Sequence, residues 1–337
     1  MALAPESGAG STAGGAALDL LAVVGPTAAG KSALAIELAS RLGGEIVNAD
    51  SMQLYRGMDI GTAKVPPAER HGVPHHLLDI WDVDEPADVA RYAGLARCAI
   101  AGIRARGNLP LLVGGSGLYL SAVLDGFRFP GTDPTVRARL ETELAAHGAQ
   151  ALHDRLAEVA PEAAASILAS NGRRLVRALE VVELTGGVQA VLPRPQARDG
   201  LVVLGIDTSE PAALDARIEQ RVIAMFDGGL PGEVRALLDA GLRRGRTASR
   251  ALGYRQVMQW WDGLLADEAE CRAMTVRATR RFARRQRSWF CRDPRVRWLR
   301  FTDLAGSDAA AVPALLKAAL AELAAGHTSV AAAIPRE

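Results

Sequence analysis

The chain has 337 residues, of which 49% are hydrophobic and 23% charged, and its formal net charge is +1. This composition allows a folded core, and the length accommodates two compact domains or one large domain with an insertion. The overall charge by itself indicates no polyanionic partner. Residues 272–300, however, contain eleven arginines and one acid, Asp293. Such a local excess of cations is typical of a nucleic-acid surface, with a solvated helix face as the alternative.

We expect no targeting signal in the N-terminal region. Residues 1–16 are small and lack periodicity, so we expect a disordered tail. The apolar run at 16–24 is short and contains Asp19, which indicates a buried strand and excludes a signal peptide or membrane span. The three cysteines are far apart without metal-like spacing, which predicts a reduced cytoplasmic protein.

Strands and helices then alternate along the chain. The predicted strands are 18–24, 45–50, 75–80 and 109–113, and the predicted helices are 31–43 and 89–106. The strands are nearly continuous apolar runs, which is typical of a parallel sheet covered on both faces. We therefore predict an α/β fold with a P-loop NTPase-like parallel sheet core and helices on both faces.

An all-helical insertion interrupts this predicted core. Between Asp133 and Gly186 only amphipathic helical patterns occur, and an apolar strand returns at 201–207. The predicted parts are a catalytic core at 17–130 and 195–302 that includes basic C-terminal helices, an insertion domain at 131–194, and an Ala-rich C-terminal helix and tail at 303–337.

The stretch GPTAAGKS fits the phosphate-binding pattern G-x-x-x-x-G-K-[ST], between a strand and a helix. Its backbone amides and helix N-terminus suit phosphate oxygens, its lysine adds a cation, and its serine hydroxyl suits Mg²⁺. The residues expected to hold a diphosphate are Gly25, Pro26, Thr27, Ala28, Ala29, Gly30, Lys31 and Ser32. The strand at 109–113 ends in glycines where a motor ATPase has an acid for Mg²⁺, which weighs against ATP turnover.

Three polar residues are candidates for the chemistry. Asp50 follows the second strand, at the sheet edge where ligands bind, and could be a general base, but with Gln53 it also fits a helix capping box. Ser116 is either a hydroxyl on the ligand side or a plain turn serine. Arg221 is either an exposed helix arginine or a cation for a diphosphate. The residues alone leave these alternatives open.

Together these motifs resemble the tRNA dimethylallyltransferase family, the bacterial tRNA isopentenyltransferases. The resemblance covers about residues 20–300 in order. Ser116 stands where threonine is usual, which keeps the hydroxyl. The matching stretches are GPTAAGKS at 25–32, ADSMQLYRGMDIGTAK at 49–64, HHLLDI at 75–80, GGSGLYL at 114–120, NGRRLVRALE at 171–180, SRALGYRQ at 249–256 and TRRFARRQRSWF at 279–290.

The resemblance implies transfer of a dimethylallyl group from dimethylallyl diphosphate to the N6 amine of the adenosine 3′ to the anticodon, in tRNAs reading codons that begin with U. Asp50 would be the general base, and Lys31, Ser32 through Mg²⁺, and Arg221 would stabilise the leaving diphosphate. The acceptor base would be flipped out of its stack, and the insertion domain at 131–194 would contact the tRNA. A cytoplasmic monomer without membrane attachment is expected. Residues implied to contact the tRNA anticodon stem-loop are Asp50, Ser51, Met52, Gln53, Ser116, Arg137, Arg173, Arg174, Arg177, Arg250, Gly253, Tyr254, Arg255, Arg280, Arg281 and Arg284.

Two alternative functions would use the same loop. An adenylate isopentenyltransferase would prenylate free AMP or ATP, and a small-molecule kinase would transfer phosphate from ATP. The helical insertion and the basic segment weigh against a free nucleotide acceptor, because AMP needs neither.

Overall fold

The computed structural model describes residues 17–127, 129–186, 195–301 and 308–326. The predicted N-terminal tail and the end of the predicted C-terminal tail lie outside these ranges. The chain divides into two compact units, one formed by Met1–Val123 with Gln196–Glu337 and the other by Leu124–Pro195. The insertion predicted for 131–194 falls within the second unit.

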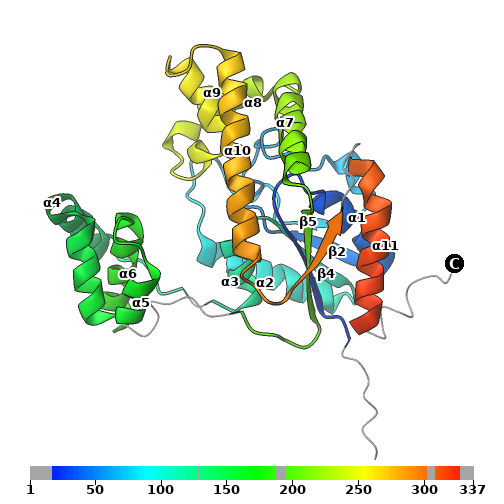
Figure 1. Cartoon of the computed structure of the whole chain (residues 1–337), viewed down its shortest axis with the longest axis horizontal. Helices are drawn as coiled ribbons and strands as arrows, with labels where there is room; N and C mark the ends of the chain where they lie inside the picture. The colour runs from blue at the N-terminus through cyan, green and yellow to red at the C-terminus, as the bar shows by residue number, and fades with distance from the viewer. Residues whose placement is uncertain (1–16, 128, 187–194, 302–307, 327–337) are drawn as a thin grey trace, which may run out of the picture. The chain divides into compact units, whose positions relative to one another are not determined.

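The larger unit is built on a parallel sheet. Its described residues form six strands in the order β3-β2-β4-β1-β5-β6, and every adjacent pair is parallel (Figure 1). Val24 at the end of β1 lies beside Gly114 of β4 and Gly205 of β5, so the carboxyl ends of these strands share one edge. The strands are β1 (Leu20–Val24), β2 (Gly44–Asn48), β3 (His75–His76), β4 (Leu109–Gly114), β5 (Leu201–Thr208) and β6 (Val296–Phe301).

Helices cover both faces of this sheet, as predicted. On one face, Leu21 and Val23 of β1 share a core with Leu34 of α1 (Lys31–Leu42) and Leu316 of α11 (Asp308–Gly326). The opposite face is covered by α2 (Val89–Ala105), which contacts β2 and β4. The Ala-rich C-terminal helix is therefore part of the core.

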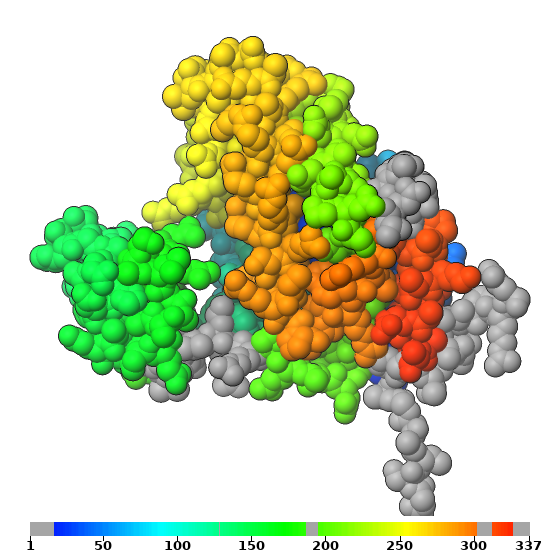
Figure 2. Space-filling view, viewed as in Figure 1, coloured from blue at the N-terminus to red at the C-terminus, as the bar shows by residue number. Residues whose placement is uncertain are grey.

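Four further helices pack on one another in this unit: α7 (Pro211–Asp227), α8 (Leu230–Asp239), α9 (Tyr254–Trp261) and α10 (Glu268–Phe290). The long α10 runs beside α7, and both present an outer face to solvent (Figure 2). The short α3 (Gly117–Leu124) follows β4. Within the described ranges, no helix combines the length and the apolar character needed to cross a membrane.

Two strands differ from the prediction. The segment expected to be extended at 75–80 is a strand only at His75–His76, because the backbone then turns at Leu77 and Asp79, which have φ values of 62° and 57°. Strand β6 was not predicted, since its apolar residues are separated by arginines within the basic segment. Its pattern VRWLRF buries only Val296 and Leu299.

The smaller unit is helical, with α4 (Pro134–Val159), α5 (Pro161–Ser166) and α6 (Gly172–Thr185). Asp133 caps α4 by accepting the N–H groups of Thr135 and Val136. Gly148, with φ 78°, breaks α4 into two stretches. These stretches and α6 bury leucines against one another, among them Leu140, Leu152, Leu156, Leu175 and Leu179.

Candidate active site

The phosphate loop joins β1 to α1 through backbone conformations that favour glycine. Gly25 has φ 142°, and a Cβ atom there would lie 2.3 Å from a backbone carbonyl oxygen of β5. Gly30 and Ala28 are left-handed, with φ values of 87° and 64°, and the alanine is strained in this region. Lys31 folds back, and its Nζ donates to the carbonyl of Pro26 at 2.7 Å. The loop thus presents a tight turn at a helix N-terminus, a geometry that suits phosphate oxygens.

Two arginines of α7 reach the same loop. Arg217 and Arg221 are four residues apart and therefore share one face of the helix. The Arg217 Nε donates to the carbonyl of Ala28 at 2.9 Å, and an Arg221 Nη donates to the Thr27 hydroxyl at 3.4 Å. With Lys31, three cations surround the loop.

The electrostatics of this cluster favour a bound anion. Burial lowers the pKa of Lys31 to about 8; the positive charge of Arg221 adds to the decrease and the carboxylate of Asp50 opposes it. Burial also lowers the pKa of Arg221, against the opposing effect of Asp50, and it lowers the pKa of Arg217. Because burial and mutual repulsion both disfavour these charges, an anion among them would relieve both penalties.

Asp50 lies just after β2, in a turn held by side chains. Its N–H donates to Asn48 Oδ1 at 2.9 Å, and its Oδ1 accepts the N–H of Met52 at 2.9 Å. The following residues form a turn and not a helix. The Gln53 side chain donates to the carbonyl of Thr62 at 3.2 Å and does not reach back toward Asp50. The capping-box alternative is therefore wrong, although Asp50 does cap the turn.

Ser116 lies beside this turn, after the end of β4. The N–H of Ser51 donates to Ser116 Oγ at 3.1 Å, and the Ser116 hydroxyl donates to Ser51 Oγ at 3.2 Å. Gly114 permits the close approach, because a Cβ atom there would lie 2.3 Å from the carbonyl oxygen of Ala49. The structure thus places Ser116 against the residue that follows Asp50.

One cavity of about 1270 Å³ joins the phosphate loop, the α7 arginines and the Asp50 turn, whereas Ser116 is not among the residues that line it. Its lining includes Thr27, Lys31, Ser32, Asp50 and Arg221, together with apolar side chains of α7 and α10. A pocket for one small ligand typically measures roughly 300–1,000 Å³, and this cavity exceeds that range. The cavity therefore brings the predicted diphosphate site and the predicted base together.

Gln286 of α10 was missed by the sequence analysis. Its Oε1 accepts the N–H of Thr27 at 2.8 Å, and its Nε2 donates to the carbonyl of Gly115 at 2.9 Å. This buried side chain connects the phosphate loop to the turn that carries Ser116. One signal in the sequence could have identified it: Gln286 is an uncharged residue among the arginines of α10, on a helix face that is buried. Arg217 was also missed, although its spacing from Arg221 pointed to it.

Glu233 of α8 holds a second loop at the site. Its carboxylate accepts the N–H groups of Asp59, Ile60 and Gly61 at 3.0, 2.7 and 3.2 Å. The hydroxyl of Tyr254 donates to the same carboxylate. The ring of Tyr254 is fully buried, so this side chain offers no surface to tRNA, contrary to the prediction.

The neighbouring residues predicted to contact tRNA differ in exposure. Arg250 and Arg255 are exposed, and Arg250 lines the cavity. Gly253 is buried at the start of α9 with φ 85°, a conformation that favours glycine.

The three α10 arginines predicted to contact tRNA differ in their partners. Arg280 donates to Glu219 of α7 at 2.7 Å, and Arg284 donates to Asp215 of the same helix at 3.1 Å. Arg281 is exposed. Arg280 and Arg284 therefore connect α10 to α7, which lowers the charge they offer to another partner.

The arginines of the helical unit differ in the same way. Arg137 of α4 and Arg177 of α6 pair with the buried Glu180 at 2.5 and 2.8 Å. Burial alone would raise the pKa of Glu180, but the hydrogen bonds from the two arginines outweigh it and hold the pKa below its usual value. Arg173 and Arg174 are exposed at the start of α6.

Comparisons with known proteins give one consistent result. The sequence model of the IPP transferase family matches residues 53–293, and that of a family described as isopentenyl transferase matches residues 18–85. Proteins named tRNA dimethylallyltransferase are similar over most of their length. That of Frankia casuarinae is 64% identical over 83% of this chain and 95% of its own, and that of Salinispora tropica is 61% identical over 90% and 95%.

Solved structures agree with the sequence comparisons. A tRNA isopentenylpyrophosphate transferase from Bacillus halodurans is 40% identical, covers 91% of this chain and 97% of its own, and has a TM-score of 0.65. A eukaryotic dimethylallyltransferase described as acting on tRNA is 25% identical, covers 90% of this chain and 78% of its own, and has a TM-score of 0.76. Because the fold, the phosphate loop and these matches agree, we conclude that the chain belongs to the IPP transferase family.

Proposed function

We propose that this enzyme transfers a dimethylallyl group from dimethylallyl diphosphate to the N6 amine of the adenosine 3′ to the anticodon of tRNA, in tRNAs reading codons that begin with U. The observation that carries the proposal is the single cavity in which the cationic phosphate loop faces Asp50. The names of the relatives support tRNA as the acceptor.

The phosphate loop is proposed to hold the leaving diphosphate. As the bond between prenyl carbon and diphosphate oxygen breaks, negative charge grows on the diphosphate. Lys31, Arg217 and Arg221 already surround the loop, so that charge would develop among cations that the fold has gathered. The lowered pKa values of these cations support an anionic ligand.

The residues fit a magnesium ion carried by the diphosphate. Over the described ranges, no three His, Cys, Asp or Glu side chains gather into a metal-binding group. The Ser32 hydroxyl is exposed in the first turn of α1 and lines the cavity. Mg²⁺ commonly binds substrate phosphates and waters with few protein ligands. When bound, Mg²⁺ would supply further positive charge to the leaving group.

Asp50 is proposed to be the general base. The lone pair of an adenine amine is delocalised into the ring, which makes the amine a weak nucleophile. As the nitrogen–carbon bond forms, the amine becomes acidic and its proton passes to the carboxylate. Hydrogen bonds through its Oδ1 and backbone N–H fix the carboxylate in the turn. A positioned base of this kind contributes about 10²–10⁴-fold in rate.

Ser116 is proposed to orient the acceptor adenine with Asp50. Its oxygen accepts one hydrogen bond, from the Ser51 N–H, and donates its own proton to Ser51 Oγ. A hydroxyl oxygen has two lone pairs, so one remains for an amine proton of the adenine. The acceptor must leave its stack in the anticodon loop to reach this position.

Three further proposals concern the tRNA contacts, the redox compartment and the oligomeric state. Exposed arginines, among them Arg173, Arg174, Arg250, Arg255 and Arg281, would bind the tRNA backbone. Cys98, Cys271 and Cys291 are free thiols, which supports a reducing compartment. We infer a monomer.

The alternatives are weaker. The family model that matches residues 53–293 includes the helical unit and the basic helix, which a free AMP acceptor does not need. A kinase acting through this loop would usually place an acid for Mg²⁺ at the end of a neighbouring strand. Here β4 ends at Gly114, and Asp207 of β5 pairs with Arg287 at 2.7 Å.

One assay tests the proposal. The enzyme is incubated with labelled dimethylallyl diphosphate and either tRNA, AMP or no acceptor. We expect label in tRNA, at the adenosine 3′ to the anticodon. Label in AMP but not in tRNA would contradict the proposal, as would phosphate transfer from ATP with no use of the prenyl donor.

A further inference from the structure

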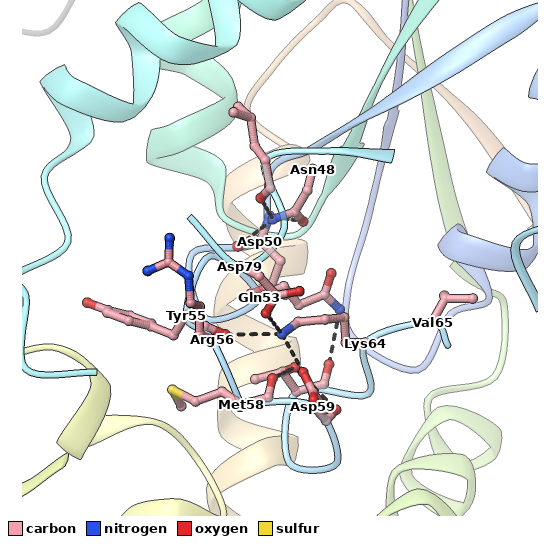
Figure 3. Close-up of polar contacts among 12 residues, drawn as sticks. Asn48, Asp50, Gln53, Tyr55, Arg56, Met58, Asp59, Lys64, Val65 and Asp79 are labelled. Atoms are coloured by element: carbon pink, nitrogen blue, oxygen red, sulfur yellow. Dashed lines mark hydrogen bonds and ion pairs between the residues drawn. The ribbon is translucent and has the colours of Figure 1, made fainter. Parts of the chain in front are cut away.

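Lys64 has a buried ammonium group at the centre of the loops beside Asp50 (Figure 3). Its side chain is only 4% exposed. Its Nζ donates to Asp59 Oδ1 at 2.5 Å, to Asp79 Oδ1 at 2.6 Å and to the carbonyl of Tyr55 at 3.0 Å. An ammonium has three N–H donors, so these bonds use all of them.

The composition of the chain makes this lysine unusual. Of 39 basic residues only three are lysines: Lys31, Lys64 and Lys317. An ammonium places three donors on one small atom, whereas a guanidinium spreads five donors over a planar fork. Three acceptors that converge within 2.5–3.0 Å of one atom therefore suit lysine and not arginine.

The contact with Asp79 leads to the proposed base. Two residues before Asp79, the carbonyl of Leu77 accepts the Asn48 side-chain amide at 3.0 Å. The same amide donates to the Asp50 carbonyl at 3.1 Å, and Asn48 Oδ1 accepts the Asp50 N–H. Asp79 also donates its own N–H to the carbonyl of Gln53 at 3.3 Å. The segment that Lys64 holds thus forms one side of the Asp50 turn.

The contact with Asp59 leads to the proposed diphosphate cation. The N–H of Lys64 donates to the Asp59 carbonyl at 3.0 Å, which closes the loop between them. Within that loop, the Thr62 carbonyl accepts an Nη of Arg221 at 3.4 Å and the Gln53 side-chain amide at 3.2 Å. One ammonium therefore connects the loop against Arg221 to the segment against Asp50.

The backbone around these contacts is strained. Ala63, Leu77 and Asp79 have φ values of 48°, 62° and 57°, in the left-handed region that side chains with a Cβ rarely adopt. Each such conformation is unfavourable and persists only where its surroundings hold it. Lys64 contacts Asp79 directly and follows Ala63 in the chain, so it is placed to hold this conformation.

We propose that Lys64 is a positioning residue for the transfer reaction: through Asp79 and Asp59 it sets the relative placement of the Asp50 carboxylate and the Arg221 guanidinium. The inference rests on the proposed function, because it assumes that these two groups act on one reaction. Lys64 lines the cavity, but its three ammonium donors are all used by Tyr55, Asp59 and Asp79, which leaves none for a substrate.

The test compares Lys64→Met with the parent in steady-state prenyl transfer, normalised to active sites by binding of inorganic diphosphate. We expect kcat to fall about 100-fold, since a misplacement near 1 Å has this effect, while the KM for each substrate stays within about threefold. Asp79→Asn keeps an acceptor oxygen but loses its charge, and we expect a smaller fall in kcat of about tenfold. Lys317→Met, at an exposed lysine of α11, is the matched control and should match the parent.

A purely structural role would lower the folded fraction and the melting temperature without changing kcat per active site. A kcat of Lys64→Met within about threefold of the parent would therefore overturn the inference. If Lys64→Met does not fold, the kcat of Asp79→Asn is the test, and a value within about threefold of the parent would overturn the inference. A parent enzyme that does not prenylate tRNA would instead overturn the proposed function.

Discussion

The side chain of Gln286 accepts a hydrogen bond from the N–H of Thr27 at 2.8 Å, although 259 residues separate the two in the sequence. The bond connects the long helix α10 to the phosphate loop. It predicts that Gln286→Leu leaves the Thr27 N–H and the Gly115 carbonyl without this partner, at a cost of about 1–3 kcal/mol in the free energy of unfolding.

Urea unfolding measures this cost, and calorimetry with inorganic diphosphate measures the accompanying loss of affinity. Gln259→Leu, on the neighbouring helix α9, is the control. Equal stability and equal diphosphate affinity in the Gln286 variant and the parent would show that the bridge does not organise the loop.

Asp50→Asn should lower prenyl transfer by about 10²–10⁴-fold, because an amide cannot take the amine proton. The amide keeps an oxygen that can accept the Met52 N–H, so the turn should remain folded. Binding of tRNA, measured by filter retention, should change little. Asp262→Asn, at an exposed aspartate paired with Arg243, is the control. Near-parental turnover of the Asp50 variant would eliminate the base assignment.

The pairing of the α10 arginines predicts unequal effects on tRNA binding. Arg281→Ala removes an exposed charge, so affinity should fall and the slope of log K against log salt should decrease by about one. Arg280→Ala should have a smaller effect, because Arg280 already pairs with Glu219. Binding isotherms at several salt concentrations provide the measurement. If both variants behave like the parent, the helix is a solvated face.

Glu45 predicts a pH-dependent contribution to stability. A hydrogen bond from Arg106, together with bonds from Asn108 and His76, holds the pKa of the buried Glu45 at about 2, against the opposing effect of burial. Because this pKa is below the unfolded value, the contribution is complete above the unfolded pKa of about 4.5 and is lost as the pH falls toward 2.

Glu45→Gln should therefore reduce the free energy of unfolding at pH 7 by at most about 3 kcal/mol. The difference from the parent should shrink between pH 4.5 and the lowest pH at which the protein folds. Urea titrations at pH 7, 5 and 3.5 follow this change, with the more exposed Glu37→Gln as control. A difference that does not depend on pH would contradict the electrostatic explanation.

The parallel sheet and the phosphate loop could be predicted because their signals are local. Apolar runs mark β1, β2, β4 and β5, and GPTAAGKS lies between a strand and a helix. Strand β6 could not be predicted in the same way. It lies at the sheet edge with exposed arginines at positions 297 and 300, so its apolar residues do not form a continuous run.

The loops that shape the site could not be predicted, because their contacts join distant segments. Nothing in the sequence around Lys64 marks it as buried, and one of its three partners, Asp79, is brought to it by the turns at residues 77–79. Glu233 and Gln286 likewise act on backbone groups far away in the chain. Hydrophobic periodicity identifies individual helices and strands, whereas Lys64, Glu233 and Gln286 connect different helices, strands and loops.

The order of the elements along the chain has a consequence for synthesis. The helical unit, Leu124–Pro195, is contiguous and is complete well before the C-terminus is made. The core is not, since the face of the sheet that α1 covers in part is completed by α11, which ends at Gly326. A ribosome-bound chain therefore holds a finished helical unit between two halves of an open sheet, and we expect that intermediate to be the stage at which chaperones engage this enzyme.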